Sequence, residues 1–249
     1  MITIIIPCFN EEKYLRKTFF TIIAALKISY IKKFQIIIID DGSTDNSFSI
    51  MTMLMKKFKS IKIIKNKKNQ GLGSVFFKGV ANSKFNHLIM IPADNSHPEN
   101  ELVKILRKFT KEKETKKIVT TFYINSNKRS FIRKFFTNIY TPFLNLIFGT
   151  NFKYFNGLTV YPTKVIKNVK VYNSSFSYQI EIFVKLSKLY KYKFFFVPTI
   201  LKDRKVGSKA FRFKNSLFVF LSIFRIFINS IYYRLLNIFY KFEEKRNYI

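Results

Sequence analysis

Three polar clusters in the first hundred residues each follow directly on an apolar run of the sequence. They occupy residues 7–11, 40–45 and 93–98 and are rich in carboxylate and amide side chains. Carboxylate oxygens accept hydrogen bonds from a base and a ribose, and a carboxylate also binds the divalent cation that neutralises a pyrophosphate. If the clusters lie together, they supply the groups that a nucleoside diphosphate requires.

The apolar runs before the clusters predict buried strands, and the segments between them predict helices. Strands are expected at residues 2–6, 35–39, 61–64 and 87–91, and helices at 11–27, 47–58, 72–82 and 99–109. All-apolar strands that alternate with helices are typical of a parallel α/β sheet covered on both faces. Ligands of such sheets bind outside the carboxyl ends of the strands, where all three clusters lie. We therefore expect the clusters to converge.

The cluster at residues 40–45 also fits a purely structural role. Its Asp-Gly-Ser-Thr-Asp sequence has the chemistry of a turn followed by a helix N-cap, which needs no ligand. Taken alone, this cluster does not distinguish a binding loop from a turn. The functional interpretation depends on the combination of the three.

With residues 69–73, these clusters make the chain resemble the family-2 glycosyltransferases, which have the GT-A fold. The resemblance runs from about residue 1 to 209 and rests on IIPCFNE at 5–11, IDDGSTD at 39–45, NQGLG at 69–73 and the Ala93-Asp94 segment. Residues 177–181 and 197–209 are similar to the dolichyl- and polyprenyl-phosphate sugar synthases. The resemblance implies an inverting transferase with an α/β GT-A catalytic domain over 1–210, in which helices cover both faces of a mostly parallel central sheet.

The resemblance also implies which residues bind the nucleotide sugar. Gly71 and Gly73 would permit close approach of the backbone to the ligand, although glycine equally suits a helix-entry turn without a ligand. The residues expected in this pocket are Pro7, Asn10, Glu11, Asp40, Asp41, Gly42, Ser43, Gly71, Gly73 and Asp94.

A divalent cation, Mg or Mn, is implied at Asp94, which matches the second acid of the family's Asp-X-Asp signature. The sequence departs from that signature at Pro92, which replaces the first acid, and at Ser96, where the synthases often carry an amide. Asp41, water and the substrate phosphates could complete the site, since Mg commonly takes only one or two carboxylates. Loss of catalysis is the alternative.

The acceptor implied by the synthases is a polyprenyl phosphate, which is already anionic and needs cations rather than a general base. Arg133, Arg204 and Lys209 match the basic positions that hold this phosphate, and Thr137 is a weaker candidate. With Asp94, these three basic residues are the expected catalytic group. A sugar-hydroxyl acceptor would instead require a base near Asp94, with Glu99 or His97 as candidates.

The composition bounds the partners and the chemistry. A net charge of +31 favours an anionic partner such as phospholipid, a phosphate-bearing substrate or nucleic acid, although a codon bias toward Lys, Asn, Ile, Phe and Tyr explains the charge as well. The single cysteine, Cys8, excludes an internal disulfide, and its apolar surroundings predict a buried strand residue. Neither a P-loop, a zinc-type Cys/His spacing nor a Rossmann glycine motif is present.

The last forty residues differ in character from the rest. Residues 211–242 are dominated by Phe, Leu, Ile and Tyr, but Arg225 and Arg234 leave no uninterrupted stretch of the roughly 20 residues that span a membrane. Ser222, Arg225, Asn229 and Tyr233 form a polar stripe at helical spacing. We expect residues 211–249 to form an interfacial helical segment on an anionic membrane, at its cytoplasmic face. A spanning helix, or docking on the catalytic domain, is the alternative.

Three functions remain open on the sequence alone. The first is transfer of a sugar to polyprenyl phosphate, and the second is glycosylation of a saccharide hydroxyl in surface-polymer synthesis. The third is a degenerate, non-catalytic relative or a nucleic-acid binder; nucleic acid is poorly supported, because the aromatic residues sit in apolar runs rather than between exposed basic residues.

Overall fold

The computed structural model describes residues 1–124, 131–169, 171, 178–202 and 228, and only the backbone of 131–139. This part of the chain forms one seven-stranded sheet in the order β3-β2-β1-β4-β6-β5-β7. All the strands run parallel except β6, which is antiparallel to β4 and β5. The strands are β1 Ile2–Cys8, β2 Phe34–Asp40, β3 Ile61–Lys65, β4 His87–Met90, β5 Lys117–Tyr123, β6 Thr159–Pro162 and β7 Lys193–Thr199.

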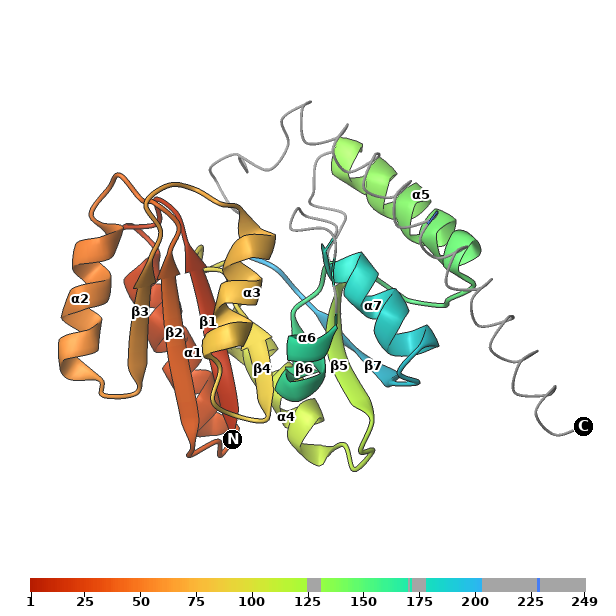
Figure 1. Ribbon diagram of the computed structural model, residues 1–249, viewed down its shortest axis with the longest axis horizontal. Helices are drawn as coiled ribbons and strands as arrows, with labels where there is room; N and C mark the ends of the chain where they lie inside the picture. Colours follow the sequence, from red (N-terminus) through yellow and green to blue (C-terminus); the bar gives the residue numbers. More distant parts are fainter. Residues whose placement is uncertain (125–130, 170, 172–177, 203–227, 229–249) are drawn as a thin grey trace, which may run out of the picture.

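Helices cover both faces of this sheet, as the sequence predicts. One core contains side chains of α1, α2 and α4, and the other contains side chains of α3, α5, α6 and α7. Figure 1 shows α3, α6 and α7 in front of the sheet and α1 and α4 behind it. The helices are α1 Leu15–Ile28, α2 Ser47–Lys57, α3 Leu72–Asn82, α4 Glu99–Lys111, α5 Phe131–Phe148, α6 Thr163–Asn168 and α7 Tyr178–Lys188.

The all-apolar strands are explained by this two-sided burial. Ile4 and Ile6 of β1 enter the core beneath α1 and α4, whereas Ile5 enters the opposite core. Successive side chains of a strand point to opposite faces, so a strand buried on both faces is apolar at most positions. The buried Thr3 of β1 is the polar exception and donates to Gln35 Oε1 of β2 (3.1 Å). The predicted α/β fold with a mostly parallel sheet is confirmed.

Two details differ from the sequence-based expectation. Helix α1 begins at Leu15 rather than near residue 11, because residues 12–14 form a turn in which the Tyr14 N–H donates to the Glu11 carbonyl three residues earlier (3.0 Å). The sheet also continues through β5, β6 and β7, beyond the region where strands were predicted.

The C-terminal prediction falls mostly outside the described residues. Of residues 211–249 only Ile228 is described, as an exposed helical residue. Within the described part of the chain, no helix combines the length and the apolar character needed to cross a bilayer. The boundary at residue 210 and the interfacial helix stay predictions.

Two buried glycines allow a test of the packing. A Cβ on Gly157 would lie 1.9 Å from the Thr121 carbonyl oxygen, whereas the three atoms nearest to a Cβ on Gly79 all belong to the side chain of Ile5, at 2.7–2.8 Å. A backbone carbonyl cannot move aside as a side chain does, so Gly157→Ala should destabilise more than Gly79→Ala, for which overpacking costs about 1–3 kcal/mol. Urea unfolding of both variants measures the order, and the reverse order would contradict this packing.

Candidate active site

The carboxyl ends of β1, β2 and β4 lie side by side at one edge of the sheet. Strand β1 pairs in parallel with β2 on one side, up to Cys8 opposite Asp40, and with β4 on the other. Backbone contacts extend the pairing, from Asp41 N to the Cys8 oxygen (2.8 Å) and from Ala93 N to the Pro7 oxygen (3.2 Å). The loops that follow these strands therefore leave the same edge, as the positions of the three polar clusters predict.

Hydrogen bonds join the first loop to the second. Asn10, at a positive φ of 55°, donates its backbone N–H to Ser43 Oγ (3.0 Å), and its side-chain oxygen accepts from the Thr44 N–H (2.8 Å). The backbone N–H of Glu11 donates to Ser47 Oγ (2.9 Å) at the start of α2. The amide of Asn10 is thus engaged with protein, and residues 7–11 and 40–47 form one rigid unit.

The two adjacent acids after β2 have different environments. Asp40 is completely buried; its Oδ1 accepts from the Ser43 N–H (2.9 Å), and no described group hydrogen-bonds its Oδ2. Because Asp40 has no exposed surface, its observed contact is that of a residue shaping the turn. This matches the structural alternative for the cluster at residues 40–45.

Asp41 fastens the segment before α3 to the end of β2. It is 4% exposed, and its Oδ1 accepts from Asn66 Nδ2 (2.7 Å) and from Gln70 N (2.9 Å), while its Oδ2 accepts from Gly71 N (3.0 Å). A carboxylate has about four acceptor positions, so three are used and about one is left for a ligand.

The glycines near Asp41 are required by geometry. Gly42 has a φ of 78°, and a Cβ there would lie 2.8 Å from the backbone of Lys68. Gly71 is the N-cap of α3, with φ 84° and ψ 162°, a conformation that is essentially restricted to glycine. A Cβ on Gly71 would meet nothing within 4 Å, so its backbone borders open space. Gly73 is buried in the first turn of α3.

Helix α1 holds the loop after β4, at residues 93–98. Thr18 Oγ1 donates to the Ala93 carbonyl (2.8 Å) and accepts from the Asn95 N–H (2.9 Å). Asp94 is partly exposed, and its Oδ1 accepts from both the backbone N–H (3.1 Å) and the Oγ (2.7 Å) of Ser96. Ser96 therefore orients Asp94. Sequence reasoning missed Thr18, which nothing local distinguishes from the other polar residues of its helix.

The described residues contain no group of three or more His, Cys, Asp or Glu side chains placed to hold a metal ion. A single partly exposed carboxylate, Asp94, is nevertheless sufficient for Mg, which keeps several waters and is commonly shared between one or two carboxylates and substrate phosphates. The donor chemistry at this loop fits a substrate-bound cation rather than a fully enclosed one.

Comparison with known proteins identifies the family. Residues 3–173 match the family model described as "Glycosyl transferase family 2". The chain belongs to glycosyltransferase family 2. It is 24% identical to an uncharacterized glycosyltransferase of Haemophilus influenzae, over 98% of both chains. It is 26% identical to a dolichol-phosphate mannosyltransferase of Saccharomyces cerevisiae, over 41% of this chain and 39% of that enzyme.

Solved structures show the same fold. Glucosyl-3-phosphoglycerate synthase of Mycobacterium tuberculosis in complex with UDP is 13% identical and superimposes with a TM-score of 0.68, covering 91% of this chain and 80% of that one. Another structure of that enzyme contains Mn²⁺, UDP and phosphoglyceric acid, with a TM-score of 0.63 over 83% of this chain and 72% of that one. The transferase therefore has the GT-A fold.

Only some of the remaining predicted residues lie in the described part of the transferase. Arg133 and Thr137 lie on α5, within the part described by backbone alone, and Arg204 and Lys209 lie outside the described residues. His97 is buried, with its ring 6.1 Å from that of Tyr123, whereas Glu99 is exposed at the start of α4. The structure thus brings together the predicted nucleotide loops, and the acceptor residues stay predictions.

Residues 178–181, the described part of the motif at residues 177–181, are buried. Tyr178 is buried, and burial raises its pKa well above the ordinary value. Gln179 Nε2 donates to the Gly157 oxygen (2.7 Å), and Glu181 pairs with Lys185 (2.7 Å) where both side chains are nearly inaccessible. Gln179 thus ties α7 to β6 and the residues before it, whereas the Glu181–Lys185 pair lies within the helix.

Cys8 gives a chemical test of the burial of β1. It is 1% exposed, and desolvation raises its pKa to about 12 despite a hydrogen bond with Ser47. At pH 8 about one thiol in ten thousand is then ionised, so an aromatic disulfide reagent should label the protein only after unfolding. The unfolded thiol has the ordinary pKa of 9.0, below that of the folded one, so this group should reduce stability as pH rises toward 12. Rapid labelling of the native protein would contradict the burial.

Asp41→Asn tests the anchor of the segment before α3. The amide would turn a donor toward the N–H of Gly71, so the variant should lose about 2 kcal/mol of stability. Trypsin should also cleave faster at the exposed Lys67 and Lys68. Glu114→Gln, which removes a surface pair with Lys193, is the control and should change stability by less than about 0.5 kcal/mol. Equal stability of the two variants would show that Asp41 is not an anchor.

Proposed function

We propose that this family-2 glycosyltransferase moves a sugar from a nucleotide-diphospho-sugar to a polyprenyl phosphate, by direct inversion at the cytoplasmic face of a membrane. One observation carries the proposal: the chain that leaves β7 is tied to the loop that bears Asp94. The backbone N–H of Lys202 donates to the Ser96 carbonyl at 2.9 Å.

This contact supports the acceptor role of the basic residues that follow. Arg204 is two residues beyond Lys202, so its Cα lies within about 7 Å of the Lys202 Cα by chain length alone. A guanidinium offers a planar set of donors that suits phosphate oxygens, so we assign the acceptor phosphate to the chain that follows Lys202. The dolichol-phosphate mannosyltransferase among the relatives is consistent with this acceptor.

The proposed transfer requires few catalytic groups from the protein. A cation bound with the donor would stabilise the negative charge of the leaving diphosphate. Ser96 holds the Asp94 carboxylate by two hydrogen bonds, and this carboxylate would be the protein's ligand to such a cation. The acceptor phosphate attacks without losing a proton, so no general base is needed, and Arg133, Arg204 and Lys209 would hold it.

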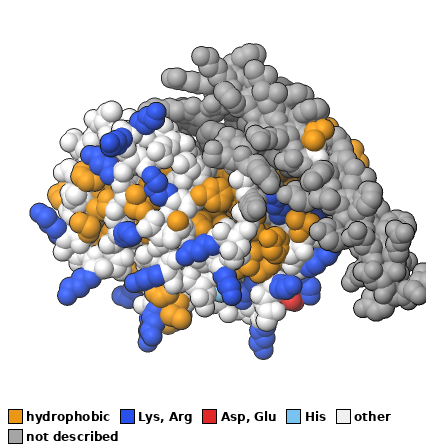
Figure 2. Space-filling view, in the orientation of Figure 1, with side chains coloured by type: hydrophobic (Ala, Val, Ile, Leu, Met, Phe, Trp, Pro, Cys, Tyr) orange, Lys and Arg blue, Asp and Glu red, His pale blue; other side chains and the backbone are white. Residues whose placement is uncertain are grey.

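Attraction to an anionic membrane is supported by the net charge of +31. On the face shown in Figure 2, Lys and Arg side chains are scattered over the described residues rather than gathered in one patch. We therefore assign membrane contact to residues 211–249, whose apolar and basic composition suits an interfacial segment.

The test is transfer of label from radioactive UDP- and GDP-sugars to polyprenyl phosphate in detergent, with and without Mg or Mn. Wild-type protein should label the lipid only with metal, and Asp94→Asn should lower the rate by about a hundredfold or more. Arg204→Ala or Lys209→Ala should raise the KM for the lipid by about tenfold or more, because each removes a charge-assisted contact.

Glu114→Gln serves as the control and should leave transfer unchanged. Donor binding without lipid labelling would overturn the acceptor and indicate a saccharide hydroxyl. If the protein bound no donor at all, the site would be degenerate, as the proline at position 92 would then indicate.

A further inference from the structure

Glu101 is a buried carboxylate on the apolar side of α4. It is 2% exposed and belongs to the buried row of that helix, with Leu102, Ile105 and Leu106. Burial of a carboxylate is costly unless hydrogen bonds and an opposite charge compensate it. The partners of Glu101 therefore show what it holds.

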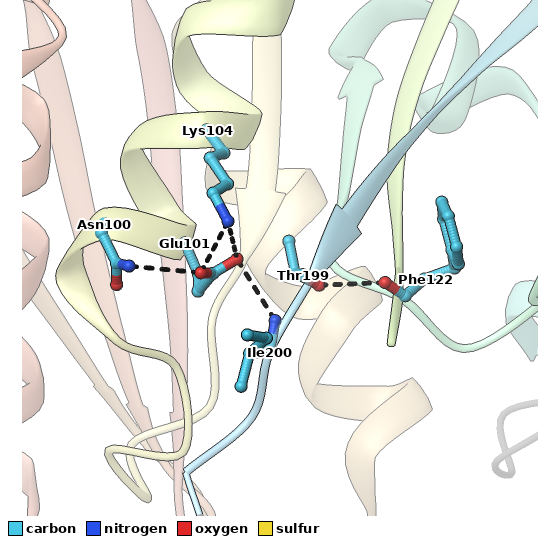
Figure 3. Close-up of polar contacts among 6 residues, drawn as sticks. All are labelled: Asn100, Glu101, Lys104, Phe122, Thr199 and Ile200. Carbon is cyan, nitrogen blue, oxygen red and sulfur yellow. Dashed lines mark hydrogen bonds and ion pairs between the residues drawn. The ribbon is translucent and has the colours of Figure 1, made fainter. Parts of the chain in front are cut away.

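Three groups bind the carboxylate, and Figure 3 shows that they approach it from two elements. Lys104 Nζ lies 2.8 and 3.0 Å from the two oxygens, and Asn100 Nδ2 lies 3.3 Å from Oε1; both belong to α4. The third group is the backbone N–H of Ile200, 3.2 Å from Oε2 and 99 residues away in sequence. Ile200 is the first residue after β7, so this bond joins the end of the sheet to α4.

Two further hydrogen bonds fix the same short stretch. Thr199 Oγ1 donates to the Phe122 carbonyl (3.2 Å), which holds the end of β7 against β5. The N–H of Lys202 donates to the Ser96 carbonyl, and Ser96 in turn holds Asp94. Residues 199–202 are thus attached on three sides, to β5, to α4 and to the Asp94 loop, and we call this stretch the exit strap.

We propose that Glu101 is a positioning residue for the acceptor: it holds the exit strap, whose last residue, Lys202, is hydrogen-bonded to the Asp94 loop. This inference rests on the proposed function, which assigns the acceptor phosphate to Arg204 and Lys209, in the chain that follows Lys202. Its direction follows from the fold, because the predicted nucleotide-binding residues other than Asp94 come from the loops after β1 and β2 and from the start of α3. The Asp94 loop is also held by Thr18 and by Ser96, through contacts that do not involve Glu101, so loss of Glu101 should affect the acceptor and spare the donor.

The test compares Glu101→Ala and Glu101→Gln with Glu112→Gln. Glu112, at the other end of α4, pairs with Lys108 at 2.9 Å, and its described partners lie outside the exit strap, so it is a matched control. Three quantities are measured: the Kd of the nucleotide sugar by calorimetry, the KM and kcat with polyprenyl phosphate, and the rate of native-state tryptic cleavage after Lys202 and Arg204.

Glu101→Ala should raise the acceptor KM and the cleavage rate by about tenfold each, the loss expected from one charge-assisted hydrogen bond, and change the donor Kd by less than twofold. Glu101→Gln keeps one carbonyl acceptor and should fall between Ala and wild type. The control should resemble wild type in all three quantities. If Glu101 contributed only to the stability of the fold, its loss would instead weaken donor binding together with transfer.

The proposal is overturned if trypsin cleaves Glu101→Ala at the same rate as Glu112→Gln, or if Glu101→Ala weakens donor binding and acceptor binding to the same extent. If Glu101→Ala unfolds at the assay temperature, Glu101→Gln decides by the same two criteria. If wild-type protein labels no lipid, the proposed acceptor fails on its own, and the cleavage rates with the donor Kd still decide whether Glu101 holds the exit strap.

Discussion

The site depends on the position of β1 between two parallel neighbours. Because β2 and β4 both run parallel to β1, the three loops that follow these strands must leave the same edge of the sheet. Backbone hydrogen bonds from Asp41 to Cys8 and from Ala93 to Pro7 continue this alignment beyond the ends of the strands. Side-chain contacts then secure the loops: Ser43 joins the first two, Thr18 of α1 holds the third at Asn95, and Asp41 holds the turn before α3. The edge is preorganised by contacts that are independent of any ligand.

Pro92 fits this arrangement for a local reason. The N–H groups of Ile91 and Ala93 donate to β1, at the carbonyls of Ile5 and Pro7, so the residue between them has its own nitrogen directed away from that strand. A proline lacks a backbone donor and is tolerated where none is needed. A proline at position 92, where the family resemblance implies an acid, therefore leaves the backbone contacts with β1 intact.

The first half of the fold was predictable because its signals are local. Two-sided burial makes β1 and β2 mainly apolar, and turn chemistry such as Asp-Gly-Ser marks where β2 ends, so strands and helices up to residue 109 were located within a few residues. Strands β5 to β7 were not predicted: β6 has only four residues, and β7 carries an exposed Lys193 and a proline.

Within the site, the loops were predictable but their contacts were not. Asp41 meets residues 25–30 positions away, and Thr18 meets residues more than 70 away, which no local pattern encodes. The burial of Glu101 does have a sequence signal, because this acid occupies the apolar phase of α4 beside Leu102 and Ile105.

The bond between Glu101 and Ile200 has a consequence for how such enzymes diversify. Its acceptor is a side chain, but its donor is a main-chain N–H that nineteen of the twenty amino acids supply. The residue at 200, and everything after it, can therefore change while the attachment persists. Position 200 is therefore a point at which a different C-terminal segment can be joined to the sheet while its attachment to α4 is kept.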